Sequence, residues 1–303
     1  MQPPDDFDPA PGQAEELSEG LRRIVAPNPS PMTYRGTNTY LLGERDIAVI
    51  DPGPESAPHL EAIMAALHPG QRISHIIVTH AHLDHSPLSR ALSERTGAPV
   101  LAFGDAKAGR SEVMQQLADA GLAGGGEGVD RAFRPDVLLA DNEVIRGDGW
   151  DMRAVWTPGH FGNHLSFVWE DAIFSGDLVM GWASSLVSPP DGDLTDFMAS
   201  CERLQQIPAL VFHPGHGAPV TQTAERLDWL LSHRRAREAA ILEALSKGSA
   251  TADILARAIY TETPAALLPA AARNVFAHLV DLKGKELIEA SGALSADAKF
   301  MLI

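Results

Sequence analysis

The sequence predicts a layered α/β domain followed by a small, mostly helical domain. Through the first two thirds of the chain, short apolar runs of strand length alternate with helical stretches, a pattern typical of one layered α/β unit. From about Ala224 the pattern changes to three helices and a short β pair. The 303 residues are long enough for both domains. We therefore expect a flexible acidic tail over 1–20, a large α/β domain over 21–223 and a C-terminal domain over 224–303.

The individual elements follow from apolar periodicity and from turn residues. The expected strands are Arg22–Ala26, Thr39–Gly43, Ile47–Ile50, His75–Thr79, Pro99–Phe103, Met152–Thr157, Leu165–Trp169, Ala172–Ser175 and Ala209–Phe212, with a C-terminal pair at Lys285–Glu289 and Lys299–Ile303. The expected helices are Ala57–Leu67, Pro87–Thr96, Asp105–Ala120, Asp193–Gln206, Ala224–Ser246, Ala250–Tyr260 and Pro264–Leu282. The glycine-rich stretch Gly121–Gly128 should be a loop. It lacks the Gly-Lys-Ser/Thr sequence and the strand-to-helix context of a phosphate-binding loop.

The N-terminal residues and the hydropathy indicate a cytoplasmic protein that does not enter a membrane. Residues 1–20 are rich in proline and acidic residues, and no basic start precedes an apolar stretch, so they do not resemble a signal peptide. No apolar run approaches the roughly 20 residues that a membrane helix needs. The single cysteine, Cys201, lies in an expected helix without a neighbouring His or Cys, which indicates a packed thiol.

The net charge of −16 argues against a broad nucleic-acid-binding surface. Residues 221–303 carry ten Lys/Arg and ten Asp/Glu, so the acidic excess belongs to residues 1–220. Part of that excess is the tail. Another part should be metal ligands, whose charge bound cations would offset.

Side chains that can bind a metal directly follow four of the apolar runs. His80, His82, Asp84 and His85 follow Ile76–Thr79, and three further runs each deliver one donor in a Pro-Gly-His or Gly-Asp turn, namely His160, Asp177 and His216. Ligands placed at strand ends converge at one edge of an α/β sheet. His80 and His82 are two residues apart, so in extended backbone they point the same way. Seven donors are too many for one tetrahedral zinc and suit two ions that share a carboxylate.

These motifs resemble the metallo-β-lactamase superfamily. Its H-x-H-x-D-H motif corresponds to His80–His85, and T-P-G-H, S-G-D and P-G-H-G correspond to 157–160, 175–177 and 214–217. The finer resemblance is to the β-lactamase-like protein 2 branch, carried by the stretches 36–40, 180–182, 188–193 and 233–237. The resemblance implies an αββα sandwich with a small C-terminal, helical winged-helix-like domain.

The resemblance also implies roles for the donors. His80, His82 and His160 would hold one metal, Asp84, His85 and His216 the other, and Asp177 and a hydroxide would bridge them. Asp51 in Ile-Asp-Pro-Gly would anchor the ligand loop, or simply start a turn. Zinc suits five imidazoles and two carboxylates, with manganese or iron as alternatives.

Two positions, one of them also a metal donor, are expected to act in catalysis. Asp84 would orient the nucleophile and pass a proton to the leaving group. His164 matches a second histidine of the family, and we predict that it faces the substrate or orients the leaving group, with a hydrogen-bonded strand-end histidine as the alternative. Asn38 and Tyr40 should lie near the site. The other six histidines lack ligand spacing and should be surface or packing residues.

The substrate is left between two classes. The branch resemblance favours a phosphodiester such as single-stranded RNA, whereas the acidic charge and Leu178, where relatives often carry a histidine after S-G-D, count against it. The other class is a thioester, lactone or other small ester, for which Trp156, Phe161 and Trp182 would line an apolar pocket. Because its charge is balanced, the C-terminal domain should serve packing or a homodimer rather than DNA binding.

Overall fold

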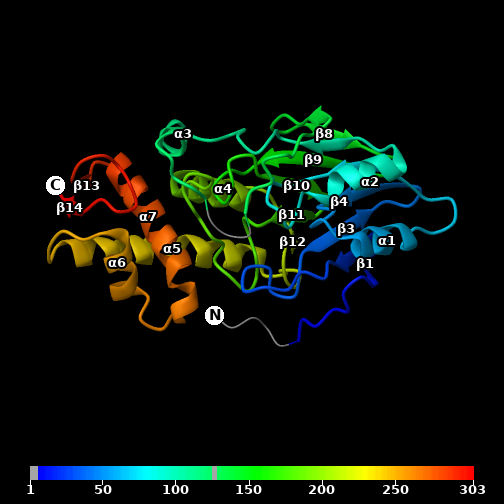
Figure 1. The fold of residues 1–303 in the computed structure, drawn as a ribbon. Helices are drawn as coiled ribbons and strands as arrows, with labels where there is room; N and C mark the ends of the chain where they lie inside the picture. Colours follow the sequence, from blue (N-terminus) through cyan, green and yellow to red (C-terminus); the bar gives the residue numbers. More distant parts are fainter. Residues whose placement is uncertain (1–5, 125–127) are drawn as a thin grey trace.

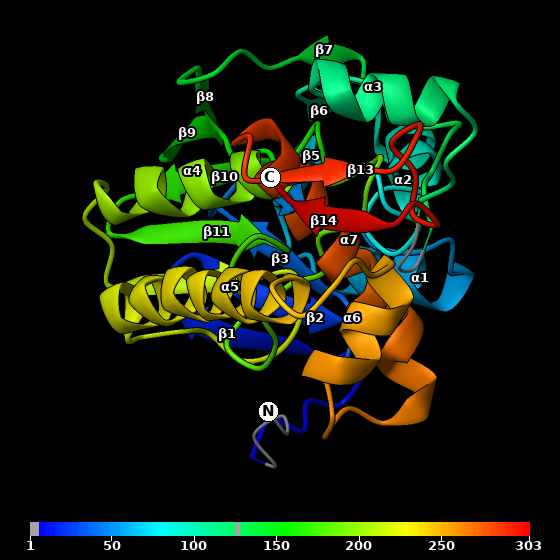
Figure 2. The same cartoon turned by 90° about the vertical axis from the view of Figure 1, so that its left-hand side faces the viewer.

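Two β-sheets pack face to face, and helices cover both outer faces (Figure 1). The computed structural model describes residues 6–124 and 128–303. In Figure 1, α4 (Leu194–Gln205) and α5 (Thr223–Leu245) lie to the left of the sheets, and α1 (Ala57–Ala65) and α2 (Leu88–Thr96) lie to the right. Figure 2 looks onto the side formed by α4 and α5. The expected αββα sandwich is therefore confirmed.

The first sheet has seven strands in sequence order. The strands from β1 to β4 pair antiparallel and those from β4 to β7 pair parallel. Their bounds are β1 Ala14–Ser18, β2 Leu21–Val25, β3 Asn38–Leu42, β4 Asp46–Ile50, β5 Arg72–Ile77, β6 Val100–Ala102 and β7 Val137–Leu138.

The second sheet has five strands in the order β12-β11-β10-β9-β8. All of its pairs are antiparallel except β11 with β12, which run parallel. The bounds are β8 Val144–Arg146, β9 Asp151–Trp156, β10 Leu165–Trp169, β11 Ala172–Gly176 and β12 Val211–Pro214.

Alternation along the strands produces three apolar layers. In β4, Ile47 and Val49 pack under α1 and α2, whereas Ala48 and Ile50 face the second sheet. Successive strand residues point to opposite faces, so one strand supplies both layers. The third layer joins the outer face of the second sheet, through Ile173 and Phe212, to α4 and α5. Cys201 is fully buried in this layer, and burial raises the pKa of its thiol to about 12, as expected for a packing cysteine.

The C-terminal region forms a core that also includes Met114 and Leu117 of the first domain, and α5 belongs to two cores. Leu227, Leu230 and Leu231 of α5 pack in the layer with α4, while Ile241 and Leu245 join the C-terminal core. That core is completed by α6 (Ala252–Ile259), a 3₁₀ turn (Ala265–Leu267), α7 (Leu268–Gly284) and the antiparallel pair β13 (Ile288–Ala290) and β14 (Phe300–Leu302). The predicted C-terminal β pair is confirmed.

Two expectations from the sequence need correction. Residues 1–20 are not a loose tail throughout, because Ala14–Ser18 forms β1 and pairs with β2, where Arg23 binds the Glu15 carboxylate. The helix expected over 105–120 is confined to α3 (Glu112–Asp119), which begins where the Ser111 hydroxyl accepts a hydrogen bond from the Met114 amide. The loop predicted over 121–128 falls partly on 125–127, outside the described residues.

Within the described ranges, the helices are too short or too polar to cross a bilayer.

Replacement of His213 should make the free energy of unfolding less dependent on pH under acidic conditions. Its ring packs 5.3 Å from Phe174 and 5.5 Å from Tyr40, and burial, with Arg23 nearby, lowers its pKa from 6.5 to about 4. The pKa of His213 is lower in the folded protein than in the unfolded chain. The neutral ring therefore makes its full contribution to folding stability above about pH 6.5, and this contribution is lost as the pH falls toward 4.

We expect metal-free His213→Phe to lose less unfolding free energy than the wild type between about pH 7.5 and pH 5, by up to about 2 kcal/mol. Urea denaturation at the two pH values measures this. The exposed His68→Gln should keep the wild-type slope, and an unchanged slope in His213→Phe would contradict the assignment.

Candidate metal centre

The loops that leave both sheets bring the seven predicted donors together. The segment 80–85 follows β5 of the first sheet, whereas the other donors follow β9, β11 and β12 of the second. The donors form two buried clusters, and within each cluster the ligand atoms lie within 4.8 Å of one another: His80, His82 and His160 in the first, and Asp84, His85, Asp177 and His216 in the second.

The first cluster presents three imidazole nitrogens to a common point. His82 Nδ1 lies 2.9 Å from His80 Nε2 and 3.1 Å from His160 Nε2. The outer nitrogen of His160, Nδ1, lies 2.7 Å from the Leu186 carbonyl, which can only accept a proton, so Nε2 offers a lone pair. The same holds for His80, whose Nδ1 faces the Thr79 hydroxyl at 2.9 Å while that hydroxyl donates to Asp51. Converging lone pairs fit a cation.

The second cluster combines two imidazoles with two carboxylates. His216 Nε2 lies 3.1 Å from Asp84 Oδ2 and 3.3 Å from Asp177 Oδ2, and His85 Nε2 lies 3.5 Å from Asp177 Oδ1. Asp177 Oδ2 is also 3.6 Å from His160 Nε2 of the first cluster. Asp177 therefore stands between the two clusters, where a bridging ligand would be needed.

The charges and unpaired atoms of the centre fit divalent metals. Among the described residues, Asp84 Oδ1 and Asp177 Oδ1 are buried without a hydrogen-bond partner. Burial, reinforced by His160, lowers the pKa of His82 to about 3, so it is a neutral donor. For His216, burial is outweighed by Asp177 and Asp84, which raise its pKa to about 10. A proton on His216 thus offsets carboxylate charge that a bound cation would otherwise neutralise.

Asp51 ties the donor segment to the first sheet. Its Oδ1 accepts from the Thr79 amide at 2.7 Å, and its Oδ2 accepts from the Thr79 hydroxyl at 2.7 Å and from His85 Nδ1 at 2.8 Å. The backbone of Asp51 has a φ of +50°, which is uncommon for a non-glycine residue. The Ile-Asp-Pro-Gly motif therefore marks an anchor as well as a turn.

Close packing explains a glycine among the donors. A Cβ on Gly215 would lie 2.3 Å from Asp177 Oδ1 and 2.7 Å from His85 Cε1. The Pro-Gly-His turn thus brings His216 back over the strand ends without filling the space between the carboxylate and the imidazole.

His164 lies behind the donors. Its Nδ1 is 3.0 Å from the Thr157 hydroxyl, and its Nε2 accepts from the Asp177 amide at 3.3 Å. The ring is fully buried, and burial, then His160, lowers its pKa to about 3. These contacts fit the alternative that His164 is a hydrogen-bonded histidine at the end of a strand, where it helps to position Asp177. They do not support direct catalysis by His164, which stays a prediction.

Asn38 and Tyr40 hold the two sheets together at the site. The Asn38 amide donates to the carbonyls of Pro214 and Gly217, both at 2.9 Å, and the Tyr40 hydroxyl donates to Pro214 at 2.7 Å. Both side chains are buried. The carbonyls of Gly36 and Leu186, which orient His216 and His160, were not found from the sequence, because a backbone acceptor carries no residue-type signal.

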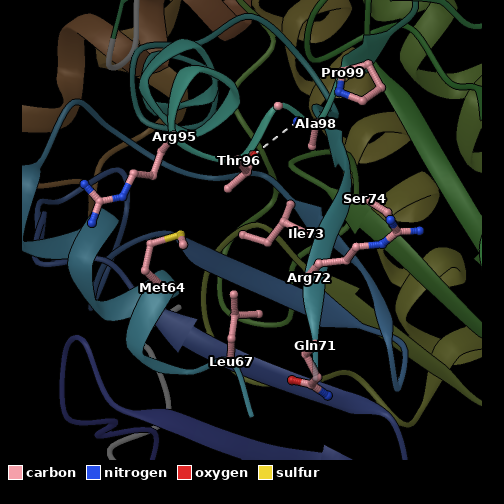
Figure 3. Close-up of a pocket in the computed structure, with 11 residues that line it drawn as sticks. Met64, Leu67, Gln71, Arg72, Ile73, Ser74, Arg95, Thr96, Ala98 and Pro99 are labelled. Atoms are coloured by element: carbon pink, nitrogen blue, oxygen red, sulfur yellow. Dashed lines mark hydrogen bonds between the residues drawn. The ribbon is translucent and has the colours of Figure 1, made fainter. Parts of the chain in front are cut away.

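A surface cavity of about 460 Å³ lies away from the donors (Figure 3). Side chains from the end of α1, the start of β5 and the end of α2 line it, including Met64, Ile73 and Arg95. None of the seven donors lines this cavity, so the chemistry belongs to the opposite ends of the strands.

The fold and this centre define the class: the chain belongs to the metallo-β-lactamase superfamily, whose members bind divalent metals and whose model matches residues 32–216. A second family model, the β-lactamase-associated winged helix domain, matches residues 251–295.

Among individual proteins, the chain is 31% identical to the Drosophila melanogaster "Beta-lactamase-like protein 2 homolog", with 94% of each chain covered. It is 30% identical to the "Atrochrysone carboxyl ACP thioesterase" of Aspergillus fumigatus, with 84% of this chain and 77% of the relative covered. A crystal structure of a metallo-β-lactamase family protein from Thermus thermophilus superposes with a TM-score of 0.76 at 25% identity, covering 95% of this chain and 100% of the other.

Asp51→Asn should weaken metal binding without unfolding the protein. The amide keeps the shape of the side chain but cannot accept from the Thr79 amide, the Thr79 hydroxyl and His85 together. We expect metal affinity to fall by about 10- to 100-fold, as for other residues that orient metal ligands. Competition with a chelator measures it. Asp46→Asn, which removes a partly exposed carboxylate from the neighbouring strand β4, is the matched control, and equal affinities in both variants would refute the anchoring role.

Proposed function

We propose that this protein is a dinuclear metal-dependent hydrolase that acts on a thioester or a related small carboxylic ester. The position of Asp177 between the two donor clusters supports the dinuclear arrangement most directly. His80, His82 and His160 would hold one ion, and Asp84, His85 and His216 the other. The donor set favours zinc, with manganese or iron as alternatives.

Two bound divalent ions would lower the pKa of a shared water toward ~7 and stabilise negative charge on the attacked group. Asp84 supplies the proton-transfer group. Its Oδ2 lies beside His216 and His85, at 3.1 and 3.4 Å, while its buried Oδ1 has no hydrogen-bond partner among the described residues. That free oxygen is available to take a proton from the nucleophile and to return it to the leaving group.

Apolar side chains beside the donors suit a carboxylic substrate. Tyr34 and Trp182 have ring centroids 5.4 Å apart, and Trp182 packs against Gly217, next to His216. Leu83, between two donors, is 45% exposed. Phe161 and Trp156 were also expected to line an apolar substrate pocket. Phe161 is instead buried against His82, and Trp156 stacks on Phe103. The thioesterase name of one relative supports the same class.

Phosphodiester hydrolysis is the second candidate, because basic residues lie near the centre. Lys107, Arg110, Arg131 and Arg134 help to line a cavity of about 440 Å³, and Val129 in its wall pairs with His82. Acidic residues, including Asp191, line the same cavity, however, and Asp191 binds Arg110 at 2.6 Å. This charge compensation leaves little attraction for a polyanion, so we place the phosphodiester second.

A cytoplasmic location and a homodimer also remain proposals.

Asp84→Asn tests the proposed function. We expect the wild type to hydrolyse members of a thioester, lactone and ester panel, and the variant to lose at least about 100-fold in kcat/KM, because it cannot carry the proton. Metal content, measured on both proteins, separates loss of the proton carrier from loss of a ligand. Asp46→Asn serves as the control and should match the wild type.

Single-stranded RNA is assayed in parallel. RNA cleavage that is lost in Asp84→Asn, without turnover of the panel, would move the assignment to phosphodiester hydrolysis. Fewer than two tightly bound metals in the reconstituted wild type would refute the dinuclear proposal.

A further inference from the structure

We propose that Arg234 of α5 and Asn274 of α7 are positioning residues that orient the metal ligand His160 through the segment 184–188. The inference rests on the proposed metal site and is independent of the substrate. It assigns to the winged-helix domain a role in assembling the metal centre, since Asn274 lies within the part of the chain that matches that family.

The contact chain begins at His160. Its Nδ1 donates to the Leu186 carbonyl at 2.7 Å, and this bond directs Nε2 toward His82 and the candidate metal position. The residues on both sides of Leu186 are held from the C-terminal helices. Arg234 donates to the Ser185 carbonyl at 2.7 Å, and the Asn274 side-chain oxygen accepts from the Val187 amide at 3.0 Å.

Further hydrogen bonds link Arg234, Asn274 and the segment 184–188 into one network. Arg234 also donates to the Ser184 carbonyl at 2.7 Å and to the Asn274 oxygen at 2.9 Å, so the two residues fix each other. Arg273, next to Asn274, donates to the Ser188 hydroxyl at 3.1 Å. The segment 184–188 is thus held at four of its five residues by α5 and α7, and the fifth, Leu186, is the residue that binds His160.

The held segment has an uncommon backbone conformation. Ser185 has a φ of +57°, in the left-handed region that disfavours residues with a Cβ. Such a conformation persists only where the surroundings enforce it. The two hydrogen bonds from Arg234 hold it here, together with the one that the Ser185 hydroxyl donates to the Leu178 carbonyl at 3.1 Å. The next carbonyl, that of Leu186, accepts from His160.

A contribution to folding stability alone does not explain why Arg234 is buried. The residue is 1% exposed, and its hydrogen bonds within the described part of the chain go to neutral oxygens rather than to a carboxylate. The face of Phe197 lies 4.9 Å from the guanidinium carbon. Burying an unpaired charge is unfavourable, so a purely structural site would be better filled by an apolar side chain. Arginine provides several donors in a fixed plane, which suits a residue that must hold two adjacent carbonyls.

Asn274→Leu tests the proposal, because leucine keeps the approximate size of the side chain but cannot accept from Val187 or Arg234. We expect one of the two metals to bind about 10- to 100-fold more weakly, the range seen when residues that orient metal ligands are replaced. The second metal should bind as in the wild type. Zn²⁺ titration against a chelator gives the two affinities, and the spectrum of the Co²⁺-loaded protein reports on the histidine-rich site. Neither readout depends on substrate or activity.

Two control variants separate positioning from general damage. Asn274→Asp keeps the acceptor oxygens and should restore both affinities. Arg234→Gln should resemble Asn274→Leu, whereas Arg235→Gln, a change at the exposed next residue of α5, should resemble the wild type.

Urea unfolding of each metal-free variant shows whether that variant folds. If the variant at one of the two positions, Arg234 or Asn274, does not fold, the variant at the other position tests the proposal. Unchanged affinities in a folded Asn274→Leu or Arg234→Gln would overturn the proposal. So would equal weakening of both metals, or failure of Asn274→Asp to restore binding. If the wild type itself bound fewer than two metals, the proposed function would fail instead.

Discussion

The metal centre depends on one constraint: the edges of two separate sheets must be held in contact. Four donors come from the loop after β5 in the first sheet, and the other three follow strands of the second. Asn38 and Tyr40 of β3 cross this junction, because their side chains donate to the carbonyls around the turn that carries His216. The apolar layer between the sheets supplies most of the free energy of association, but it has no directionality. The buried hydrogen bonds fix the register that places His216 beside His85.

Orientation within the centre comes from the outer nitrogens of the imidazoles. Four of the five histidines direct the nitrogen that faces away from the cluster to a defined partner: the Thr79 hydroxyl, Asp51, and the carbonyls of Leu186 and Gly36. Each partner sets which ring nitrogen carries the proton and therefore which offers a lone pair. The partners belong to different loops, so the donor geometry is a property of the whole sandwich edge rather than of the H-x-H-x-D-H segment alone.

The layered α/β fold and the C-terminal β pair could be predicted from the sequence, because both depend on local periodicity. The convergence of the seven expected donors could be predicted too, because each follows the end of a strand. The sequence did not allow β1 to be predicted, since Ala14–Ser18 is largely polar and is ordered by pairing with β2 and by the packing of Leu17. His164 was expected near the substrate because it matches a second histidine of the resembled family; its burial against the Asp177 amide depends on the packing of β10 against the donor loops. The carbonyl acceptors could not be foreseen, since every residue has a carbonyl.

The domain boundary expected at residue 223 falls at the start of α5, and this helix packs in the cores of both domains. The first half of α5 packs with α4 on the catalytic sheet, and its second half lies in the C-terminal core. Arg234 sits between these halves, so the residue of α5 that holds the segment 184–188 stands at the point where the two cores meet. A shift of the C-terminal domain would therefore move Arg234 and Asn274 together, and the Leu186 carbonyl with them. On this view the winged-helix domain is a structural part of the candidate metal centre, because Arg234 and Asn274 add contacts that hold the segment 184–188 against His160.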